Sequence, residues 1–368
     1  MYLDGPVLNF ATASMGTTGG NVDTSIDLRS DTATTPTKSM RKAMADAEVG
    51  DDVLNEDPTV HKLQEYVAGL FGMEEALLVT SGTQGNAVSL LSHTRPGDLV
   101  YAERQAHVGA YEAGGYAALA GVTLEKIATV NGILTATCVR EAVLPYDDHY
   151  PNPALIWVEN THNQAGGVST GTRQMAELRE LANHKNLRIH IDGARIFNAA
   201  VAQQASVAEL SAEADSVQFC LSKGLGAPVG SMVVGSTEFI KDARKKRKML
   251  GGGLRQSGVI AAAGLVALRE IVPKLAEDHE KARILADGIN AIEGISLKFQ
   301  PPETNLVFFG YEMEKNRVMQ FVEELAGGGI RIAVRGGVTR LALYHQISFQ
   351  QVGYVLEAMQ KAADKVRS

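Results

Sequence analysis

The feature that most constrains this chain is an alternation of short apolar runs with longer amphipathic stretches. Helix-type spacing over residues 83–94 and 172–185 separates several of the apolar runs. The strand-like runs cover residues 76–82, 98–103, 122–130, 154–160, 187–196, 216–220 and 230–236. Strands that alternate with helices predict an α/β fold with a largely parallel sheet.

The length of the chain bounds the number of domains. Its 368 residues suit one large or two ordinary domains, with enough chain for a real core. We expect an N-terminal arm over residues 1–26, whose second half is rich in Gly, Thr and Ser. A large domain is expected over residues 27–270, and a small C-terminal α+β domain over residues 271–368.

Composition argues against several classes of partner. A net charge of −7 gives no electrostatic support for nucleic-acid binding, and the dense basic run at 241–248 is interpreted as a solvated helix face. Two cysteines, Cys138 and Cys220, form no disulfide framework and favour a reducing, cytoplasmic compartment. No apolar run reaches the roughly 18 residues of a membrane span, and the N-terminus is not typical of a signal peptide. We therefore expect no membrane association.

Hydrogen-bonding or reactive side chains follow five of the predicted strands. In open α/β sheets, ligands bind beyond the carboxyl ends of the strands. The residues at these ends are Ser81, Gly82 and Thr83; Gln105 and His107; Glu159, Asn160, Thr161 and His162; Asp192 and Arg195; and Ser222 and Lys223. One polar strand end is ordinary, because strands must end in something polar. Five such ends together predict a binding site.

Asp192 and Lys223 suggest which ligand this site takes. A Schiff-base lysine and an acidic partner for a pyridinium nitrogen are the requirements of pyridoxal 5'-phosphate (PLP). The small residues 81–83 precede a helical pattern, so they offer backbone N–H groups for a phosphate. Taken singly, these features also fit a turn-forming Asp, a snorkelling surface Lys and a plain helix N-cap. Taken together, they predict a PLP site.

Two further positions add to this interpretation. His107 could stack on a planar ring or move a proton near neutral pH, although a lone histidine is more often structural. Arg255, in the glycine-rich stretch 251–258, suits a phosphate, although such a stretch also fits a helix-capping loop. The stretch 224–230 lacks the strand, glycine motif and helix order of a dinucleotide site, so that alternative is weak.

Through these residues and the motifs around them, the chain resembles the threonine aldolases, which are PLP enzymes of the aspartate-aminotransferase-like fold (fold type I). The matching stretches are DLRSDTATTPT (27–37), AEVGDDVLNEDPTV (47–60), SGTQGN (81–86), AHVGAYEAGG (106–115), ENTHN (159–163), HIDGARIFNA (190–199), CLSKGLGAPVGS (220–231) and RKMLGGGLRQSGVIAAAGL (247–265). The C-terminal third matches through TRLALYH (339–345). The resemblance implies a mostly parallel seven-stranded sheet in the large domain. It also implies a homotetramer, a dimer of dimers, with active sites at the dimer interface.

The resemblance also implies roles for single residues. Lys223 would form the Schiff base with PLP, Asp192 would face the pyridine nitrogen, and His107 would stack on the ring. Arg195 would lie beside the 3-oxygen of the ring. The other implied contacts are Gly82 and Thr83 with the phosphate, Arg255 and Lys248 reaching the phosphate from a neighbouring subunit, Ser30 and Arg340 with the substrate carboxylate, and His149 with the substrate hydroxyl. No metal site is expected.

The chain departs from the family pattern at two places. Leu54 and Asn55 stand where the family usually has Tyr and Gly, and Tyr344 precedes His345 where the family has Thr. The first departure leaves substrate range and stereochemical preference open.

The implied reaction is PLP-dependent retro-aldol cleavage of a β-hydroxy-α-amino acid such as L-threonine or L-allo-threonine. The products would be glycine and an aldehyde, with His107 or His149 as the general base. Another PLP reaction on the same fold, such as racemisation or β-elimination, stays open because fold does not fix reaction. A non-catalytic binding protein is a third alternative, and the intact Lys223, Asp192, Arg195 and His107 argue against it.

Overall fold

The structure is a computed structural model, and it describes residues 25–145, 147–299 and 301–367. Nearly all of the predicted N-terminal arm, residues 1–24, lies outside the described residues. The chain forms two compact units, one of residues 34–275 and one that joins residues 25–33 to residues from 276 onward. Among the described residues, no helix combines the length and apolar character needed to cross a bilayer.

The larger unit is built on a seven-stranded sheet with the strand order β2-β8-β7-β6-β5-β3-β4. Its strands are β2 (Glu75–Val79), β3 (Leu99–Glu103), β4 (Thr123–Ile127), β5 (Pro153–Glu159), β6 (Arg188–Asp192), β7 (Ser216–Cys220) and β8 (Ser231–Gly235). Only β8 is antiparallel to its neighbours, β2 and β7, while the other pairs of adjacent strands are parallel. The mostly parallel seven-stranded sheet expected from the sequence is therefore confirmed.

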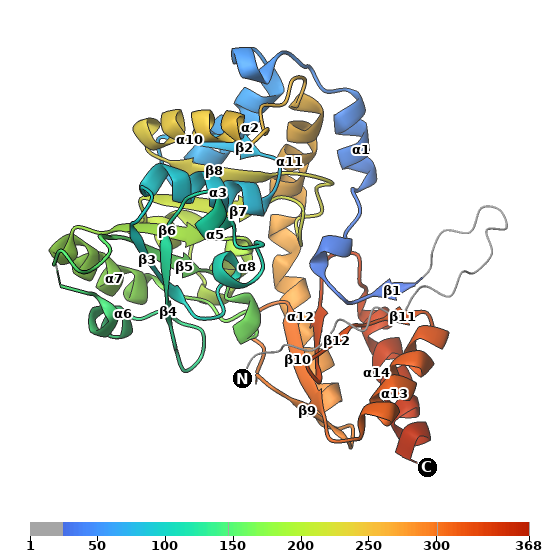
Figure 1. Cartoon of the computed structure of the whole chain (residues 1–368). Helices are drawn as coiled ribbons and strands as arrows, with labels where there is room; N and C mark the ends of the chain where they lie inside the picture. Colours follow the sequence, from blue (N-terminus) through green and yellow to red (C-terminus); the bar gives the residue numbers. More distant parts are fainter. Residues whose placement is uncertain (1–24, 146, 300, 368) are drawn as a thin grey trace. The chain divides into compact units, whose positions relative to one another are not determined.

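Helices cover both faces of this sheet (Figure 1). The longer ones are α1 (Lys38–Ala45), α2 (Pro58–Phe71), α3 (Gly82–His93), α7 (Thr172–Lys185), α8 (Ile196–Gln203), α10 (Thr237–Met249) and α11 (Gly258–Glu270). The shorter ones are α4 (His107–Ala110), α5 (Gly115–Ala118), α6 (Ala136–Ala142) and α9 (Val207–Ser211). Alternate residues of the strands serve the two faces: Leu78 packs into the cluster with α2 and α11, and Leu77 into the cluster with α3 and α10.

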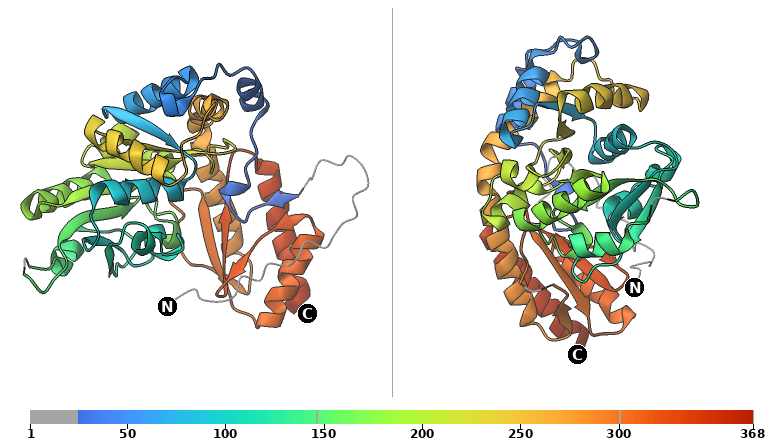
Figure 2. Two further views of the ribbon diagram at one scale, coloured as in Figure 1. Left: turned by 45° about the horizontal axis from the view of Figure 1, so that its top comes forward. Right: turned by 90° about the vertical axis from the view of Figure 1, so that its left-hand side faces the viewer.

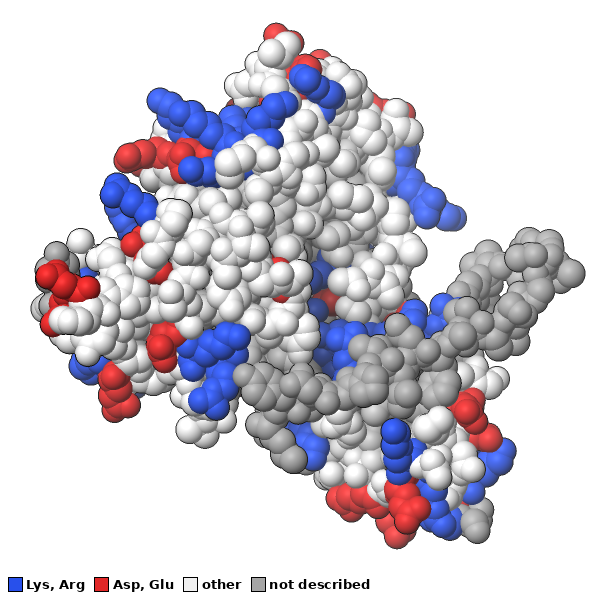
Figure 3. Space-filling model, in the orientation of Figure 1, with Lys and Arg blue, Asp and Glu red and all other residues white. Residues whose placement is uncertain are grey.

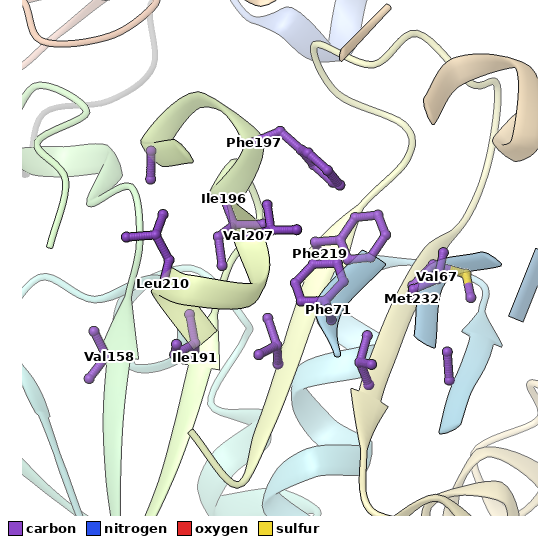
Figure 4. Close-up of a cluster of buried hydrophobic side chains, with 14 of the residues drawn as sticks. Val67, Phe71, Val158, Ile191, Ile196, Phe197, Val207, Leu210, Phe219 and Met232 are labelled. Atoms are coloured by element: carbon purple, nitrogen blue, oxygen red, sulfur yellow. The ribbon is translucent and has the colours of Figure 1, made fainter. Parts of the chain in front are cut away.

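Three phenylalanines form the centre of the larger core (Figure 4). The ring of Phe71, from α2, stacks on that of Phe219, from β7, at a centroid distance of 5.3 Å. Phe197, from α8, meets Phe219 edge to face at 5.3 Å. Burial of each such ring contributes about 1.5–3 kcal/mol. The same strand that carries Phe219 leads into Lys223, so this packing anchors the segment before the lysine.

The smaller unit places helices on one face of a four-stranded antiparallel sheet. The strand order is β12-β13-β10-β9, and β1 pairs separately with β11 in parallel. The strands are β1 (Ile26–Asp27), β9 (Ile295–Leu297), β10 (Leu306–Tyr311), β11 (Ile330–Arg331), β12 (Val334–Arg335) and β13 (Val338–Ala342). The helices, orange and red in Figure 2, are α12 (Leu275–Asn290), α13 (Lys315–Gly327) and α14 (Phe349–Arg367). Val307 and Leu341 face these helices, whereas Leu306 and Ala342 form a small cluster on the opposite face.

Two boundaries differ from the sequence-based expectation. Residues 27–33, expected in the large domain, belong to the smaller unit because Ile26 and Asp27 pair with Ile330 and Arg331. The larger unit ends at residue 275 and not at 270, after the 3-10 turn Val272–Lys274 that separates α11 from the next helix. The proline of this turn cannot donate a helical hydrogen bond.

The basic run 241–248 forms the second half of α10. Basic side chains gather over α10 at the upper left of Figure 3, beside acidic ones. Lys241, Lys245 and Lys248 are exposed, as a solvated helix face requires. Arg247 is the exception, because it is buried, pairs with Asp52 at 2.7 Å and donates to the carbonyl of Leu78 at 2.7 Å. The basic run therefore contains one buried ion pair that ties α10 to the segment before α2.

Candidate active site

The register of the parallel strands gathers the predicted strand ends at one edge of the sheet. Glu159, at the end of β5, is paired with Asp192, at the end of β6. Asp192 is in turn paired with Gln218 of β7, two residues before that strand ends at Cys220. Lys223 follows three residues after Cys220, in the loop after β7. The structure thus brings Glu159, Asp192 and the segment carrying Lys223 to the same edge.

Asp192 is buried, with 2% of its surface exposed. Its carboxylate accepts hydrogen bonds from Asn86 Nδ2 at 2.8 Å and from the backbone N–H of Ala194 at 3.2 Å. The pKa of Asp192 is raised to about 6, mainly by burial and also by the charges of Glu159 and Glu112, while His107 and Lys223 act in the opposite direction. The buried carboxyl group of Asp192 can therefore share a proton with a basic atom of a ligand bound at this edge.

Lys223 lies in a loop whose backbone is held by hydrogen bonds to other protein groups. Leu221 N–H donates to the carbonyl of Gly230 at 3.1 Å at the base of this loop. The carbonyl of Lys223 accepts from Gly226 N–H at 2.9 Å and from the Thr34 hydroxyl at 2.9 Å. These contacts fix the backbone of the lysine at the end of a buried strand.

His107 begins α4 and is held from two sides. Its backbone N–H donates to Glu159 Oε2 at 2.6 Å, and its ring Nδ1 lies 2.8 Å from Glu112 Oε1. Burial lowers the pKa of His107, but the hydrogen bond to Glu112 and the charges of Asp192, Glu112 and Glu159 outweigh it, so the pKa is raised. The imidazole is therefore held in a defined orientation and is more basic than usual.

The first turn of α3 has the features expected for a phosphate site. Ser81 is the N-cap and accepts from Gln84 N–H at 3.1 Å, and α3 continues for 12 residues. A Cβ atom at Gly82 would lie 2.8 Å from Cys220 Sγ, so only glycine fits there. A Cβ atom at Gly252 would clash with the side chain of Gln84, which means that the loop before Arg255 passes close to this turn. Thr83 is exposed in this first turn.

Three of the predicted residues take part in other contacts. Arg195 is buried and its guanidinium lies 3.5 Å from Asn163 Oδ1, close to the end of β6. Arg255 pairs with Asp51 at 2.9 Å. Lys248 is exposed at the end of α10, and its side chain lies along the backbone of Gly253. Lys248 and Arg255 thus flank the same glycine-rich loop.

The predicted carboxylate-binding residues lie together in the smaller unit. Arg340, in β13, donates through Nη2 to the carbonyl of Arg29 at 3.0 Å. Arg29 directly precedes Ser30, whose hydroxyl accepts from Thr32 Oγ1 at 2.9 Å. Arg340 thus contacts the residue that precedes Ser30, although 311 positions separate Arg29 from Arg340 in the sequence.

His149 requires a correction. It precedes Pro153, the first residue of β5, so it lies at the amino edge of the sheet, whereas Asp192 and Glu159 lie at the carboxyl edge. The seven residues of β5 span roughly 20 Å, which no histidine side chain can bridge. Its side chain is 87% exposed and bonds only to Asp147 among the contacts seen for it in the described residues. Within one chain, the role predicted for His149 at the substrate hydroxyl is not supported.

Of the two positions where the chain departs from the family pattern at 54–55, the backbone conformation explains Asn55. Asn55 has φ 60°, in the left-handed region that favours glycine and tolerates asparagine. Asn55 therefore keeps the backbone turn that a glycine at this position would provide. Leu54 is 64% exposed, and nothing in the structure explains its choice.

Sequence reasoning missed three buried polar residues at this edge. Asn86 and Glu112 contact Asp192 and His107, and Glu103 lies 2.8 Å from His162 Nε2. Glu112 and Asn86 stand inside quoted motifs, but neither directly follows a strand. The one signal in the sequence that could have indicated them is that Glu112 lies close to His107, and Asn86 close to Ser81, along the chain.

A family model described as β-eliminating lyase matches residues 27–313. The chain belongs to this β-eliminating lyase family. A relative from Arabidopsis thaliana, low-specificity L-threonine aldolase 1, is 42% identical over 92% of this chain and 96% of its own length. Low specificity L-threonine aldolase from Escherichia coli is 44% identical over 77% of this chain and 84% of its own length. A solved threonine aldolase from Leishmania major has a TM-score of 0.79 at 17% identity and covers 92% of this chain and 99% of its own, so it supports the fold.

For a β-eliminating lyase, the side chains at this edge fit a PLP cofactor. Asp192 supplies a buried carboxylate, Lys223 an amine and the first turn of α3 an anion seat with a required glycine. His107, Glu112 and Asp192 also place three potential metal-ligand atoms within 4.8 Å of one another. The amide of Asn86 already donates to both carboxylates of that group, so a hydrogen-bonded network accounts for their proximity.

Proposed function

We propose that this protein is a PLP-dependent lyase that cleaves β-hydroxy-α-amino acids, with L-threonine and L-allo-threonine as substrates and glycine and an aldehyde as products. The observation that carries the proposal is the convergence of Asp192, Lys223 and His107 at one sheet edge. The names of the relatives, low-specificity L-threonine aldolase, support the choice of substrate.

The residues of the larger unit bind and polarise the cofactor in this proposal. PLP, when bound, acts as the electron sink for the bond that breaks. Lys223 would hold the cofactor covalently, and Asp192 would keep a proton at the ring nitrogen, for which a buried carboxylate is suited. Gly82 and Thr83 receive the phosphate at the N-terminus of α3, with Arg255 and Lys248 contributed by a neighbouring subunit. Arg195 would lie beside the 3-oxygen of the ring.

The remaining residues orient the substrate. Arg340 binds the carboxylate through its planar guanidinium, which fixes orientation as well as charge, and Ser30 adds a hydroxyl. Because Glu112 occupies Nδ1 of His107, Nε2 is the ring atom left to accept the proton of the β-hydroxyl. General-base help of this kind contributes about 10²–10⁴-fold to the rate. We therefore propose His107, and not His149, as the general base.

We also propose a homotetramer, a dimer of dimers, whose dimer interface completes each active site. Arg255 and Lys248 would then serve the partner's phosphate site. The two cysteines, neither of them in a disulfide, fit a cytoplasmic location for the enzyme.

The test compares the purified, PLP-loaded protein with its Lys223→Ala variant. L-threonine and L-allo-threonine are supplied separately, and aldehyde and glycine are both quantified. The wild type should release them in equal amounts, and Lys223→Ala should lose both this activity and the visible absorbance band. Lys241→Ala, on the exposed face of α10, is the matched control and should keep both. Wild-type activity in Lys223→Ala would refute the role of the lysine.

β-Elimination is the second candidate, because the matching family model is named for it. An eliminating enzyme would release ammonia and a keto acid from the same amino acids, and would produce no glycine. Measuring ammonia in the same reactions separates the two activities.

A further inference from the structure

Four side chains of the candidate active site form a continuous hydrogen-bonded network. Glu112 Oε1 accepts from Asn86 Nδ2 at 2.6 Å and lies 2.8 Å from His107 Nδ1. The same Asn86 nitrogen donates to Asp192 Oδ2 at 2.8 Å. The two hydrogens of one amide are therefore shared between two carboxylates, and the order of the chain is His107, Glu112, Asn86 and Asp192.

The members of this chain are shielded from water to different extents. Glu112, Asn86 and Asp192 are buried, whereas the His107 side chain is 34% exposed. Buried carboxylates are costly unless each is hydrogen-bonded, and here each one is. The histidine end of this network is therefore the more exposed one.

We propose that Glu112 is a positioning residue for the lyase reaction: it fixes the ring orientation and tautomer of His107 and, through Asn86, couples His107 to the carboxylate of Asp192. The proposal rests on the proposed function, because His107 and Asp192 matter to catalysis only if the site binds PLP.

The geometry gives Glu112 two separate effects. An ionised carboxylate at 2.8 Å requires a proton on His107 Nδ1, which leaves Nε2 free to accept one. The negative charge also stabilises the imidazolium form, in line with the raised pKa of His107. The bridging amide meanwhile holds Asp192 Oδ2 at a set position. Glu112 touches neither substrate nor ring in this account, so its effect passes through His107 and Asn86.

The first experiment is independent of activity. The imidazole nitrogens of His107 are followed by NMR in the cofactor-free protein as pH is varied, for the wild type and for Glu112→Gln. The expected result is a lower pKa for His107 in Glu112→Gln, with a partial return in Glu112→Asp. Glu125→Gln removes an exposed glutamate from β4 in the same unit and should leave the His107 titration unchanged. An unchanged His107 titration in Glu112→Gln would overturn the proposal.

The second experiment uses the PLP-loaded enzyme. Glu112→Gln should lower kcat for L-threonine by about tenfold or more, with KM within about threefold of the wild type, because the general base is disturbed and the carboxylate contact is not. Asn86→Leu cuts the link to Asp192 and should shift the pH dependence of the visible PLP band. A Glu112→Gln enzyme with wild-type kcat would count against the proposal.

These outcomes separate this inference from the proposed function. If the wild type releases no aldehyde, the proposed function fails, although the NMR titration still reports on the network. If the wild type is active and Glu112→Gln matches it in both kcat and His107 titration, the lyase assignment stands and the positioning role is wrong. Thermal midpoints of all variants show whether each one is folded.

Discussion

Two histidines of the larger unit share one hydroxyl group away from the candidate active site. His93 Nε2 lies 2.6 Å from Ser216 Oγ, and His190 Nδ1 lies 2.7 Å from the same oxygen. His93 stacks on Phe239 at a centroid distance of 4.6 Å, and His190 contacts Trp157. Burial lowers the pKa of His93 to about 4 and lowers the pKa of His190 well below its usual value. Both histidines are therefore neutral in the folded protein at neutral pH.

This pair predicts a loss of stability in mild acid. In the unfolded chain a histidine takes up its proton near pH 6.5, whereas folded His93 does so near 4. The unfolded state therefore binds more protons between these values, and the free energy of unfolding falls as pH drops from about 6.5 to 4. Replacing His93 by Gln should reduce the loss between pH 7 and pH 5 by about 1–2 kcal/mol.

The measurement is urea unfolding of the cofactor-free protein at the two pH values. His184→Gln, at an exposed position in α7, is the matched control and should leave the difference as in the wild type. An identical pH dependence in His93→Gln would show that His93 is not the group responsible.

At the scale of elements, one carboxylate joins three segments of the larger unit. Asp57 is the N-cap of α2 and accepts from the backbone N–H groups of Thr59 at 3.1 Å and Val60 at 3.0 Å. Its other oxygen accepts from Gly50 N–H at 3.2 Å and from Gly258 N–H, at the start of α11, at 2.8 Å. Asp57 is fully buried, so all of these donors depend on it.

Replacing Asp57 by Ala should therefore destabilise the protein strongly. A lost N-cap costs about 0.5–2 kcal/mol, and each buried donor left without an acceptor adds about 1–3 kcal/mol. We expect a loss of about 3 kcal/mol or more in the free energy of unfolding, measured by urea denaturation. Asp57→Asn keeps an acceptor oxygen and should lose less. Asp46→Ala, at the exposed end of α1, should change stability little, and an equally mild effect of Asp57→Ala would contradict this assignment.

The strands that precede the candidate site residues could be predicted, because hydrophobic periodicity depends only on residues close together in the sequence. The strands before Ser81, Asp192 and Lys223 stand in the sequence as short apolar runs, and the rule for ligands at carboxyl ends then locates the site. The partners of these residues were not predictable. Glu112 and Asn86 lie in different segments that only the folded chain brings together, and sequence spacing carries no information on such pairs.

The same limit applies elsewhere. The role of His149 was predicted by resemblance alone, and local periodicity does not say at which edge of a sheet a loop residue lies. Arg247 stands among exposed basic residues of α10, and only its partner Asp52, far away in sequence, reveals that it is buried. Residues 27–33 look continuous with the large domain until β1 is seen to pair with β11.

At the scale of the whole molecule, the two units hold different sets of predicted residues. Lys223, Asp192 and His107 belong to the larger unit, and Ser30 and Arg340 to the smaller one. Binding of the cofactor and binding of the substrate carboxylate are thus assigned to separate compact parts of the chain. Substitutions in one unit should affect one of these functions selectively.

Arg340→Ala tests this separation. The variant should raise KM for L-threonine by about 10–100-fold, because a hydrogen-bonded charge pair with the carboxylate contributes about 1.5–3 kcal/mol. The dissociation constant for PLP, measured by titration of the visible band, should stay within about twofold of the wild type. Arg317→Ala, in the first turn of α13, is the control and should change neither constant. A large loss of PLP affinity in Arg340→Ala would show that the two functions are not separate.

The closed loop around Lys223 has a consequence for how the holoenzyme is assembled. Three hydrogen bonds from other parts of the protein and from within the loop hold its backbone: Leu221 to Gly230, Gly226 to Lys223, and Thr34 to Lys223. The entropy of ordering this backbone is therefore lost during folding and not when the cofactor arrives. Newly made chains can therefore fold before they bind the vitamin-derived cofactor, and the cofactor-free protein already has the backbone conformation that binding requires. Cofactor scarcity would then limit how much of the protein is active, while the amount that folds stays the same.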